Sequence, residues 1–383
     1  MRGRLWPRLK NMTKKDIAEI RKSMKLDTCC LTMIGVCYVS QQDGPTGASM
    51  FRFLTLEEEV MGKYLELAKK GLSGKLGKNI VNLASDGSGE PLGGILAEVR
   101  ETKNEEAILK FAEQIAASYV CDTDYCIMCL FGTYDVPASS SKKDQFLDSE
   151  EVYDFVQCLI LPVKMSKPGL AYDLKEGGVC SRKLIHEINA PSHAFLYPVF
   201  TDRSTDVDHI LYYAKKPAED QSPLLVQLHA AVPKGPDMQK ESFQTVIQAG
   251  LGDKVPYEAL KGIYETIAQQ LEEAVDASEP ASMTAGDIAR LAQREAGYAD
   301  VAFDEEAAME AAASVGDSPI VLSNVLPDTV TIKASEAVLK VAKNDLPGIQ
   351  RRTIDGVDYY LVPAAGSEVE GLDTANINEI RNS

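Results

Sequence analysis

Residues 195–209 (FLYPVFTDRSTDVDH) constrain the fold more than any other part of the chain. The segment begins with a short apolar run, and such a run beside turn-forming residues is typical of a strand in a sheet interior. The charged residues that follow place a turn at the end of this strand. We expect the turn to start a helix over residues 206–215, because Thr205 and Asp208 stand at the spacing of a capping box.

The charged turn is the densest group of polar side chains in the chain, and three interpretations of it compete. An arginine and two hydroxyls at a helix N-terminus would bind an anion, because free N–H groups and the helix dipole attract negative charge. Three aspartates beside a histidine would instead bind a divalent cation. In the third interpretation, which we favour, these residues only cap the helix and pair with each other. The candidate ligand-binding residues are Asp202, Arg203, Ser204, Thr205, Asp206, Asp208 and His209, of which Asp202, Asp206 and Asp208 are the candidate metal ligands.

Tyr134 and Asp135 form a second candidate ligand-binding site. They follow an apolar segment, residues 125–131, which we predict to be a strand. Open α/β sheets bind ligands just beyond the ends of their strands, so this position is favourable for a site. The alternative, which we favour, is a turn that ends the strand ahead of Pro137.

Two of the eight cysteines, Cys126 and Cys129, have the spacing C-x-x-C. Their flanks are apolar and predict a strand, in which residues three apart face opposite sides of the sheet. A zinc or redox site needs both sulfur atoms on the same side. We therefore predict structural thiols and, because no secretion signal is present, a reducing cytoplasmic location.

No motif of a hydrolase elbow, a zinc protease or a dinucleotide-binding fold occurs in the sequence. Residues 71–79 (GLSGKLGKN) resemble a phosphate loop, but Gly71 and Gly77 are one residue too far apart, and Asn79 replaces the hydroxyl that binds magnesium. The four histidines show no metal-ligand spacing. We therefore expect a protein without enzymatic activity and predict no cofactor, with a divalent cation at the charged turn as the alternative.

Apolar periodicity predicts the remaining elements. Predicted helices cover residues 16–24, 56–72, 92–100, 105–119, 223–231, 238–251, 256–275, 284–296 and 304–313. Predicted strands cover residues 29–40, 50–54, 152–163, 329–333, 338–342, 349–354 and 357–362. Prolines and glycines bracket a further hairpin between residues 168 and 178, and Asp355-Gly356 is the strongest hairpin turn in the chain.

These elements predict an α/β or α+β fold, in which a mixed sheet packs with helices and a small α+β module follows at the C-terminal end. We divide the chain into a basic leader (1–11, ahead of a second possible start at Met12), a main α/β domain (12–275), a linker (276–283) and an acidic module of helices and a β-hairpin (284–383).

The charge distribution limits the possible partners. Residues 1–25 carry nine basic and two acidic side chains, a net charge of +7, whereas the whole chain carries −17. The remaining residues, at −24, repel polyphosphates, so we expect a protein partner that docks on the acidic C-terminal module. Contact with nucleic acid is expected only through a local basic patch: Lys63, Lys69, Lys70, Lys75 and Lys78. No apolar run reaches the roughly 18 residues of a membrane helix, so we expect no membrane partner.

Four segments carry a family resemblance: YDVP at 134–137, CLILPVK at 158–164, FLYPVFTDRSTD at 195–206 and RTIDG at 352–356. On these segments the chain resembles a domain-of-unknown-function family of anaerobic Gram-positive gut and soil bacteria, from residue 12 to about residue 355. The resemblance implies a cytoplasmic bacterial protein that starts at Met12, and it supplies no catalytic residue. We therefore expect an uncharacterised interaction or regulatory protein. The alternatives are a metal- or phosphate-dependent enzyme or sensor at residues 202–209, and a nucleoid- or ribosome-associated factor.

Overall fold

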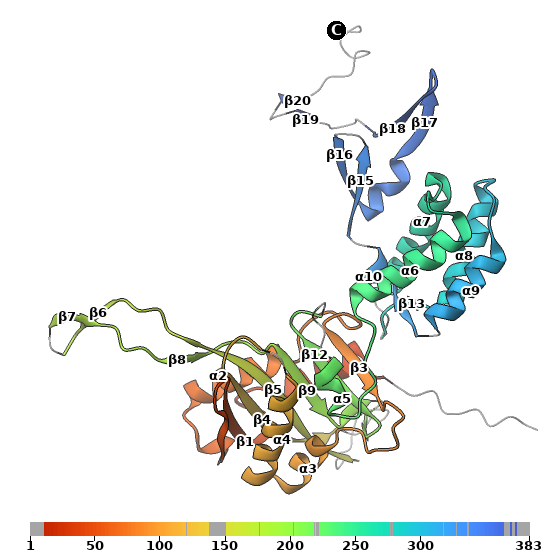
Figure 1. Ribbon diagram of the computed structural model, residues 1–383. Coiled ribbons are helices and arrows are strands. Elements are labelled where there is room, and N and C mark those ends of the chain that lie inside the picture. Colours follow the sequence, from red (N-terminus) through yellow and green to blue (C-terminus); the bar gives the residue numbers. More distant parts are fainter. Residues whose placement is uncertain are drawn as a thin grey trace, which may run out of the picture. The chain divides into compact units, whose positions relative to one another are not determined.

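The chain forms two compact units, residues 1–237 and 238–383 (Figure 1). The computed structural model describes residues 11–119, 121–137, 151–175, 177–201, 203–217, 219, 222–275, 277, 279–316, 318–326, 328–334, 337–363, 368–369 and 372–373. The division between the units lies ahead of the predicted linker at 276–283. Helices α6 (Pro236–Leu251) and α7 (Tyr257–Glu273), which we assigned to the main domain, share one apolar core with α8 (Ala285–Tyr298) of the second unit.

A large antiparallel sheet is the centre of the first unit. Along the sheet the strands follow the order β2-β1-β4-β5-β9-β12-β3, and β8 pairs with the far end of β5. The strands are β1 (Leu31–Ser40), β2 (Gly44–Arg52), β3 (Ile80–Ala84), β4 (Tyr125–Val136), β5 (Glu151–Met165), β8 (His186–Ile188), β9 (His193–Tyr197) and β12 (His209–Ala214). The fold is therefore α+β, one of the two predicted classes, and the strand pairings described for this sheet are antiparallel rather than mixed.

Both faces of this sheet are buried, and β4 shows how one strand supplies both cores. Cys129 belongs to one apolar core, with Ile127 and Phe131, whereas Cys126 belongs to the core on the opposite face, with Met128. Alternation along the strand produces this division. The prediction that the two cysteines face opposite sides of a strand is confirmed.

Helices cover each face of the sheet. On one face, α1 (Lys14–Ser23) and α2 (Glu58–Lys70) bury Ile17, Ile20 and Leu65; a 3₁₀ turn, η1 (Phe53–Thr55), precedes α2. The helices on the other face are α3 (Ile95–Thr102), α4 (Glu105–Ser118) and the short α5 (Ser222–Val226). The predicted helix over 223–231 is accordingly shorter than expected.

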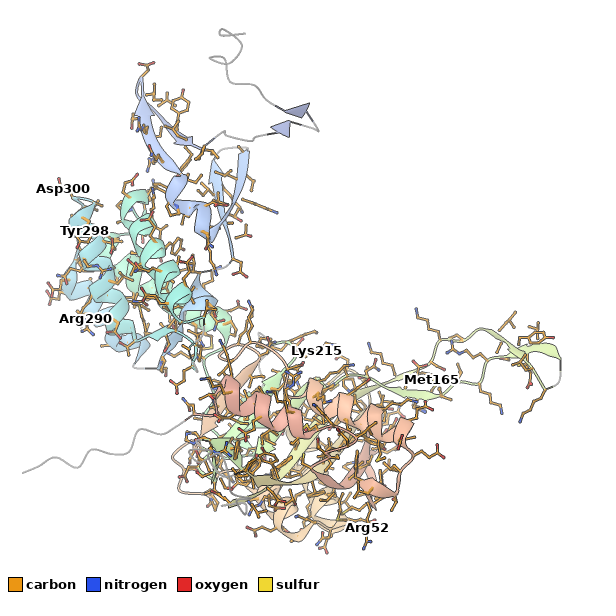
Figure 2. The ribbon with its side chains drawn as sticks, turned by 180° about the vertical axis from the view of Figure 1, so that it is seen from behind. Arg52, Met165, Lys215, Arg290, Tyr298 and Asp300 are labelled. Atoms are coloured by element: carbon orange, nitrogen blue, oxygen red, sulfur yellow. The ribbon has the colours of Figure 1, made fainter. Side chains whose placement is uncertain are left out.

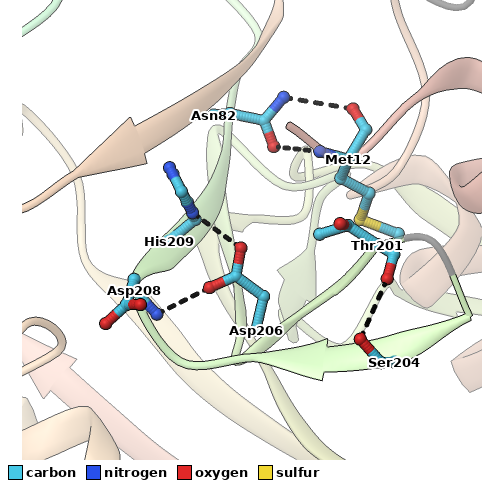
Figure 3. Close-up of polar contacts among 7 residues, drawn as sticks. All are labelled: Met12, Asn82, Thr201, Ser204, Asp206, Asp208 and His209. Atoms are coloured by element: carbon cyan, nitrogen blue, oxygen red, sulfur yellow. Dashed lines mark hydrogen bonds and ion pairs between the residues drawn. The ribbon is translucent and has the colours of Figure 1, made fainter. Parts of the chain in front are cut away.

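The N-terminal end of α1 is fixed by two sets of hydrogen bonds. Thr13 is the N-cap of α1 and forms a capping box with Asp16. Ahead of it, Met12 is fully buried, and Asn82 of β3 holds its backbone on both sides. The Met12 N–H donates to Asn82 Oδ1 at 3.0 Å, and Asn82 Nδ2 donates to the Met12 carbonyl at 3.1 Å (Figure 3).

A two-stranded extension leaves the sheet at the end of β5. Residues 164–188, named here the β-arm, continue β5 and β8 outward and end in the hairpin of β6 (Leu170–Asp173) and β7 (Gly178–Ser181). Figure 1 shows this hairpin well away from the helices of the first unit. The predicted hairpin between residues 168 and 178 is thereby confirmed.

The second unit is a group of helices followed by short hairpins. Its core lies among α6, α7, α8, α9 (Glu305–Val315) and α10 (Leu322–Val325). Thr284 and Asp287 form a capping box at the start of α8, which lies within the helix predicted from residue 284. The remaining elements are β13 (Ser282–Met283), β14 (Ile320–Val321), β15 (Thr329–Ala334), β16 (Ala337–Ala342), η2 (Lys343–Gly348), β17 (Gln350–Ile354), β18 (Val357–Leu361), β19 (Glu368–Val369) and β20 (Leu372–Asp373). The hairpin predicted at Asp355-Gly356 is the β17–β18 turn.

Within the described residues, no helix has the length and apolarity needed to span a membrane.

Candidate functional sites

The charged turn joins strands, and the helix predicted over residues 206–215 is wrong. β10 (Val199–Thr201) and β11 (Ser204–Asp206) form a small hairpin, and β12 follows directly from His209. β12 pairs with β9 on one side and with β3 on the other. Its sequence, HILYYA, is rich in β-branched and aromatic residues, and two neighbouring strands outweigh a local capping pattern.

Asp206 organises the turn into β12 (Figure 3). Its Oδ2 lies 2.7 Å from Nδ1 of His209, and its Oδ1 accepts the N–H of Asp208 at 2.8 Å. The His209 side chain is almost fully buried at the first position of the strand. A carboxylate that accepts the N–H two residues ahead is the usual stabiliser of such a turn, so both oxygens have a structural role.

The turn does not assemble a recognisable catalytic group. The hydroxyl of Ser204 donates to the carbonyl of Thr201 at 3.3 Å, so it is not directed at His209 as a nucleophile would be. The N–H of Thr205 donates to Glu151 Oε1 at 2.8 Å. Asp202 lies outside the described residues. Among the described residues, no three His, Cys, Asp or Glu side chains are arranged to hold a metal ion. The predicted cation site includes Asp202 and therefore stays a prediction.

Arg203 points away from the turn and toward α1. Its Nη1 lies 3.4 Å from Glu19 Oε1, and its Nη2 donates to the carbonyl of Pro137. The predicted anion site needed the N–H groups of a helix N-terminus at this position, and β11 stands there instead. Arg203 thus binds a carboxylate of its own chain.

The carboxylate of Glu19 also joins Tyr134 to Arg203. The Tyr134 hydroxyl donates to Glu19 Oε1 at 2.8 Å, and burial together with this hydrogen bond raises the pKa of Tyr134 to about 12. Tyr134 and Asp135 lie inside β4, paired with β5, so the predicted strand-ending turn at these residues is wrong. The pairing with β5 continues to Val136 and carries the strand past its expected end. Glu19 was missed because nothing in its local sequence indicates a long-range partner.

A pocket of about 450 Å³ adjoins this cluster. Its lining residues are Glu19, Lys22, Ser23, Thr28, Cys29, Cys30, Thr133, Tyr134 and Asp135. Burial raises the pKa of Cys29 and that of Cys30, the latter to about 11, so neither thiol is readily ionised for nucleophilic chemistry. The pocket therefore brings Tyr134 and Asp135 together with Glu19, while the residues of the charged turn from Ser204 to His209 do not line it.

The β-arm carries an exposed apolar face that sequence reasoning missed. Tyr172 pairs with Val179, and these two side chains are 62% and 67% exposed. Leu170, two residues before Tyr172, stands on the same face and is 80% exposed. The opposite face carries Ala171 and Cys180. Period-two spacing of Leu170 and Tyr172 was the available signal, but a sequence pattern does not show whether a neighbouring layer covers a strand.

Basic residues flank this apolar face. The β-arm contains five basic side chains (Lys164, Lys167, Lys175, Arg182, Lys183) and three acidic ones (Asp173, Glu176, Glu187). Its net charge of +2 contrasts with −17 for the whole chain. Arg182 lies 3.9 Å from Glu187, a long ion pair, and the described structure shows no ion pair for Lys167 or Lys183.

The basic patch predicted around α2 is partly neutralised. Lys63 pairs with Glu59 at 2.6 Å within the helix, and Lys69 and Lys70 stand in its last turn. Gly71 is the C-cap of α2 and β3 follows at Ile80, so residues 71–79 lead from a helix into a strand, the reverse of the order around a phosphate loop.

The fold and these sites define an α+β protein with a projecting β-arm. The model of a family described as "Domain of unknown function (DUF4317)" matches residues 12–372. Because the match covers most of the chain, the protein belongs to this family, and the predicted membership of an uncharacterised family is confirmed. No curated protein and no solved structure matches the chain.

Proposed function

We propose that the protein is a non-enzymatic interaction protein that docks a macromolecular partner through the β-arm. The observation that carries the proposal is the apolar face of Leu170, Tyr172 and Val179, which no layer of the first unit covers. A contiguous exposed apolar surface on a projecting element typically marks an interaction site. This surface becomes buried only when a partner binds, so its burial contributes free energy to binding and not to folding.

A protein partner fits this surface better than a nucleic acid. An interface core enriched in tyrosine and aliphatic side chains, with charges at its rim, is typical of protein–protein contacts. The β-arm carries five basic and three acidic residues, so its net positive charge is small. Binding to the phosphates of a nucleic acid depends on many positive charges. The proposal keeps the interaction protein expected from the sequence. It assigns the docking surface to the β-arm in place of the acidic C-terminal module.

A cytoplasmic location is part of the proposal. All eight cysteines are free thiols, including the exposed Cys180 on the β-arm. Free thiols persist in reducing compartments, which supports the predicted cytoplasmic setting.

A ligand sensor is the second candidate, favoured by the pocket beside Tyr134 and Asp135. A small molecule bound there would raise the thermal stability of the native state, because it binds the folded chain only. Asp135→Asn would remove the exposed carboxylate of the pocket without disturbing the buried part of β4. A thermal shift that Asp135→Asn abolishes would favour the sensor over the interaction protein.

The experiment for the docking function compares two variants of the β-arm. In a nuclease-treated lysate of cells that naturally express the protein, the wild-type protein should retain a partner. The variant Tyr172→Ser/Val179→Ser should retain at least tenfold less of that partner. The matched control, Ala171→Ser/Cys180→Ser, changes the opposite face of the same ribbon and should retain it. Equal retention by all three proteins, or retention abolished by nuclease, would overturn the proposal.

A further inference from the structure

We infer that the occupant of the β-arm is a second copy of this chain, whose acidic second unit receives the basic, apolar ribbon. This inference rests on the proposed docking function and names its partner. It follows from where the charges of the chain are located and from the surface that the second unit exposes.

Most of the negative charge is in the second unit. Residues 238–383 contain 25 acidic and 11 basic side chains, a net charge of −14, whereas residues 1–237 carry only −3. The β-arm, at +2, therefore has the opposite sign to the unit that dominates the charge of the chain. Complementary potentials of this kind steer association and favour this pairing over arm–arm contact.

Within the second unit, the end of α8 and the start of α9 expose acidic and apolar side chains, as the β-arm exposes basic and apolar ones. Tyr298 is 79% exposed and Met309 is 43% exposed, and Asp300 lies two residues after Tyr298 (Figure 2). We name this surface the acidic patch; its members are Tyr298, Asp300, Asp304, Glu305, Glu306, Met309 and Glu310. Helix α9 contains no basic residue. The patch thus offers apolar side chains for the apolar face of the β-arm and carboxylates for its lysines.

The inference describes a closed dimer. If the β-arm of each copy docks on the acidic patch of the other, the contact occurs twice around a two-fold axis, and the assembly closes as a dimer. Doubling the contact also doubles the buried area, which a single narrow ribbon needs in order to approach the size of a stable interface.

The test measures the mass of the full-length protein by sedimentation equilibrium and light scattering across a concentration series. The wild type should be a dimer at 0.1 M salt, and its dissociation constant should rise about tenfold at 0.5 M salt, because exposed charges are screened. Tyr172→Ser/Val179→Ser should weaken the dimer at least tenfold, while Ala171→Ser/Cys180→Ser should leave the dissociation constant unchanged.

Charge reversal identifies the surface on the second copy. Glu306→Lys/Glu310→Lys should weaken the dimer at least tenfold, and the matched change Glu272→Lys/Glu273→Lys, at the end of α7, should not. Lys167→Glu/Lys183→Glu should also weaken it. Combining the Lys167→Glu/Lys183→Glu and Glu306→Lys/Glu310→Lys changes in one chain should restore the dimer, because the two surfaces are again opposite in sign.

The outcomes separate this inference from the docking function. A wild-type chain that is monomeric at every concentration, with a partner in lysate that still requires Tyr172 and Val179, would overturn the second-copy inference and leave the docking function standing. A monomer whose hydrodynamic radius alone responds to salt and to Glu306→Lys/Glu310→Lys would likewise overturn it. A dimer unaffected by any β-arm variant would also overturn the second-copy inference, and the lysate experiment with Tyr172→Ser/Val179→Ser would then decide the docking function by itself.

Discussion

Strand β5 runs from the most buried part of the first unit into the exposed β-arm. In the buried half of this ribbon the apolar side chains are covered, and in the β-arm half they are exposed. From Phe155 to Leu161 every residue is buried, with neighbours alternating between the two apolar cores. Beyond Val163 the chain continues as the same kind of antiparallel ribbon, yet its apolar side chains face solvent. Inside the sheet β5 pairs with β4 on one side and β9 on the other, whereas at the start of the β-arm it pairs with β8, so both the strand pairing and the covering layers differ.

This contrast shows that hydrophobicity in the β-arm has a different purpose from hydrophobicity in the sheet. A large side chain that is buried on folding contributes about 1.5–3 kcal/mol to the stability of the native state. The apolar side chains of the β-arm are largely exposed in the folded chain and contribute little of this kind. If the comparison is correct, substitutions in the two halves separate cleanly into effects on folding and effects on association.

The largest effect is expected in the buried half. Phe155→Ala removes a fully buried ring that stacks on Tyr153 with centroids 4.9 Å apart and an interplanar angle of 20°. The change should lower the free energy of unfolding by about 3–5 kcal/mol, because lost burial and the remaining cavity add. Val152→Ala in the same strand, where the side chain is 53% exposed, is the control and should cost under about 1 kcal/mol. Similar midpoints for the two variants in urea unfolding would break the comparison.

Elements whose ends are marked by local capping or turn residues could be predicted from the sequence. The helix ends at Thr13 and Thr284 follow from capping residues alone, and the Asp355-Gly356 hairpin follows from turn chemistry. β12 was mistaken for a helix because a capping pattern is local, whereas pairing with β9 and β3 is not. Strand contacts between distant segments decide such cases, and a single sequence does not contain them.

The candidate sites were predictable to a smaller extent. Tyr134 and Asp135 do border a pocket, but the carboxylate that joins Tyr134 to Arg203 comes from Glu19, more than a hundred residues away in the chain. Asp206 has a structural role in the turn ahead of β12, but the helix cap of the favoured interpretation is not formed there. The exposure of the β-arm was invisible because it depends on what does not pack against it.

An intermediate effect is expected on acidification, at a histidine next to β5. His193 pairs with Ile160, is buried, and its Nδ1 lies 2.9 Å from the Tyr212 hydroxyl. Burial lowers the pKa of His193 to about 4 from the ordinary 6.5, so the unfolded chain binds this proton more tightly than the folded one. Stability is therefore unaffected above pH 6.5 and falls by about 2–3 kcal/mol as the pH drops toward 4.

Replacing the histidine isolates this contribution from that of other groups. His193→Gln should remove that acid-dependent part of the unfolding free energy, whereas His186→Gln, at the exposed base of the β-arm, should leave it intact. Unfolding curves at pH 7 and pH 4.5 supply the measurement. Identical pH dependence in the wild type and His193→Gln would show that the buried imidazole is not the group responsible.

The smallest effect on folding is expected at the tip of the β-arm, where the effect on association should be greatest. Tyr172→Ser/Val179→Ser removes two large apolar side chains, but both are mostly exposed in the folded chain. The free energy of unfolding of the monomer should therefore change by less than about 0.5 kcal/mol, as for most surface substitutions. Urea unfolding at a concentration below the dimer dissociation constant excludes any contribution from association. A loss of 2 kcal/mol or more at that concentration, of the size expected for buried side chains, would mean that the apolar face packs within its own chain. The contrast between the buried part of β5 and the β-arm would then disappear.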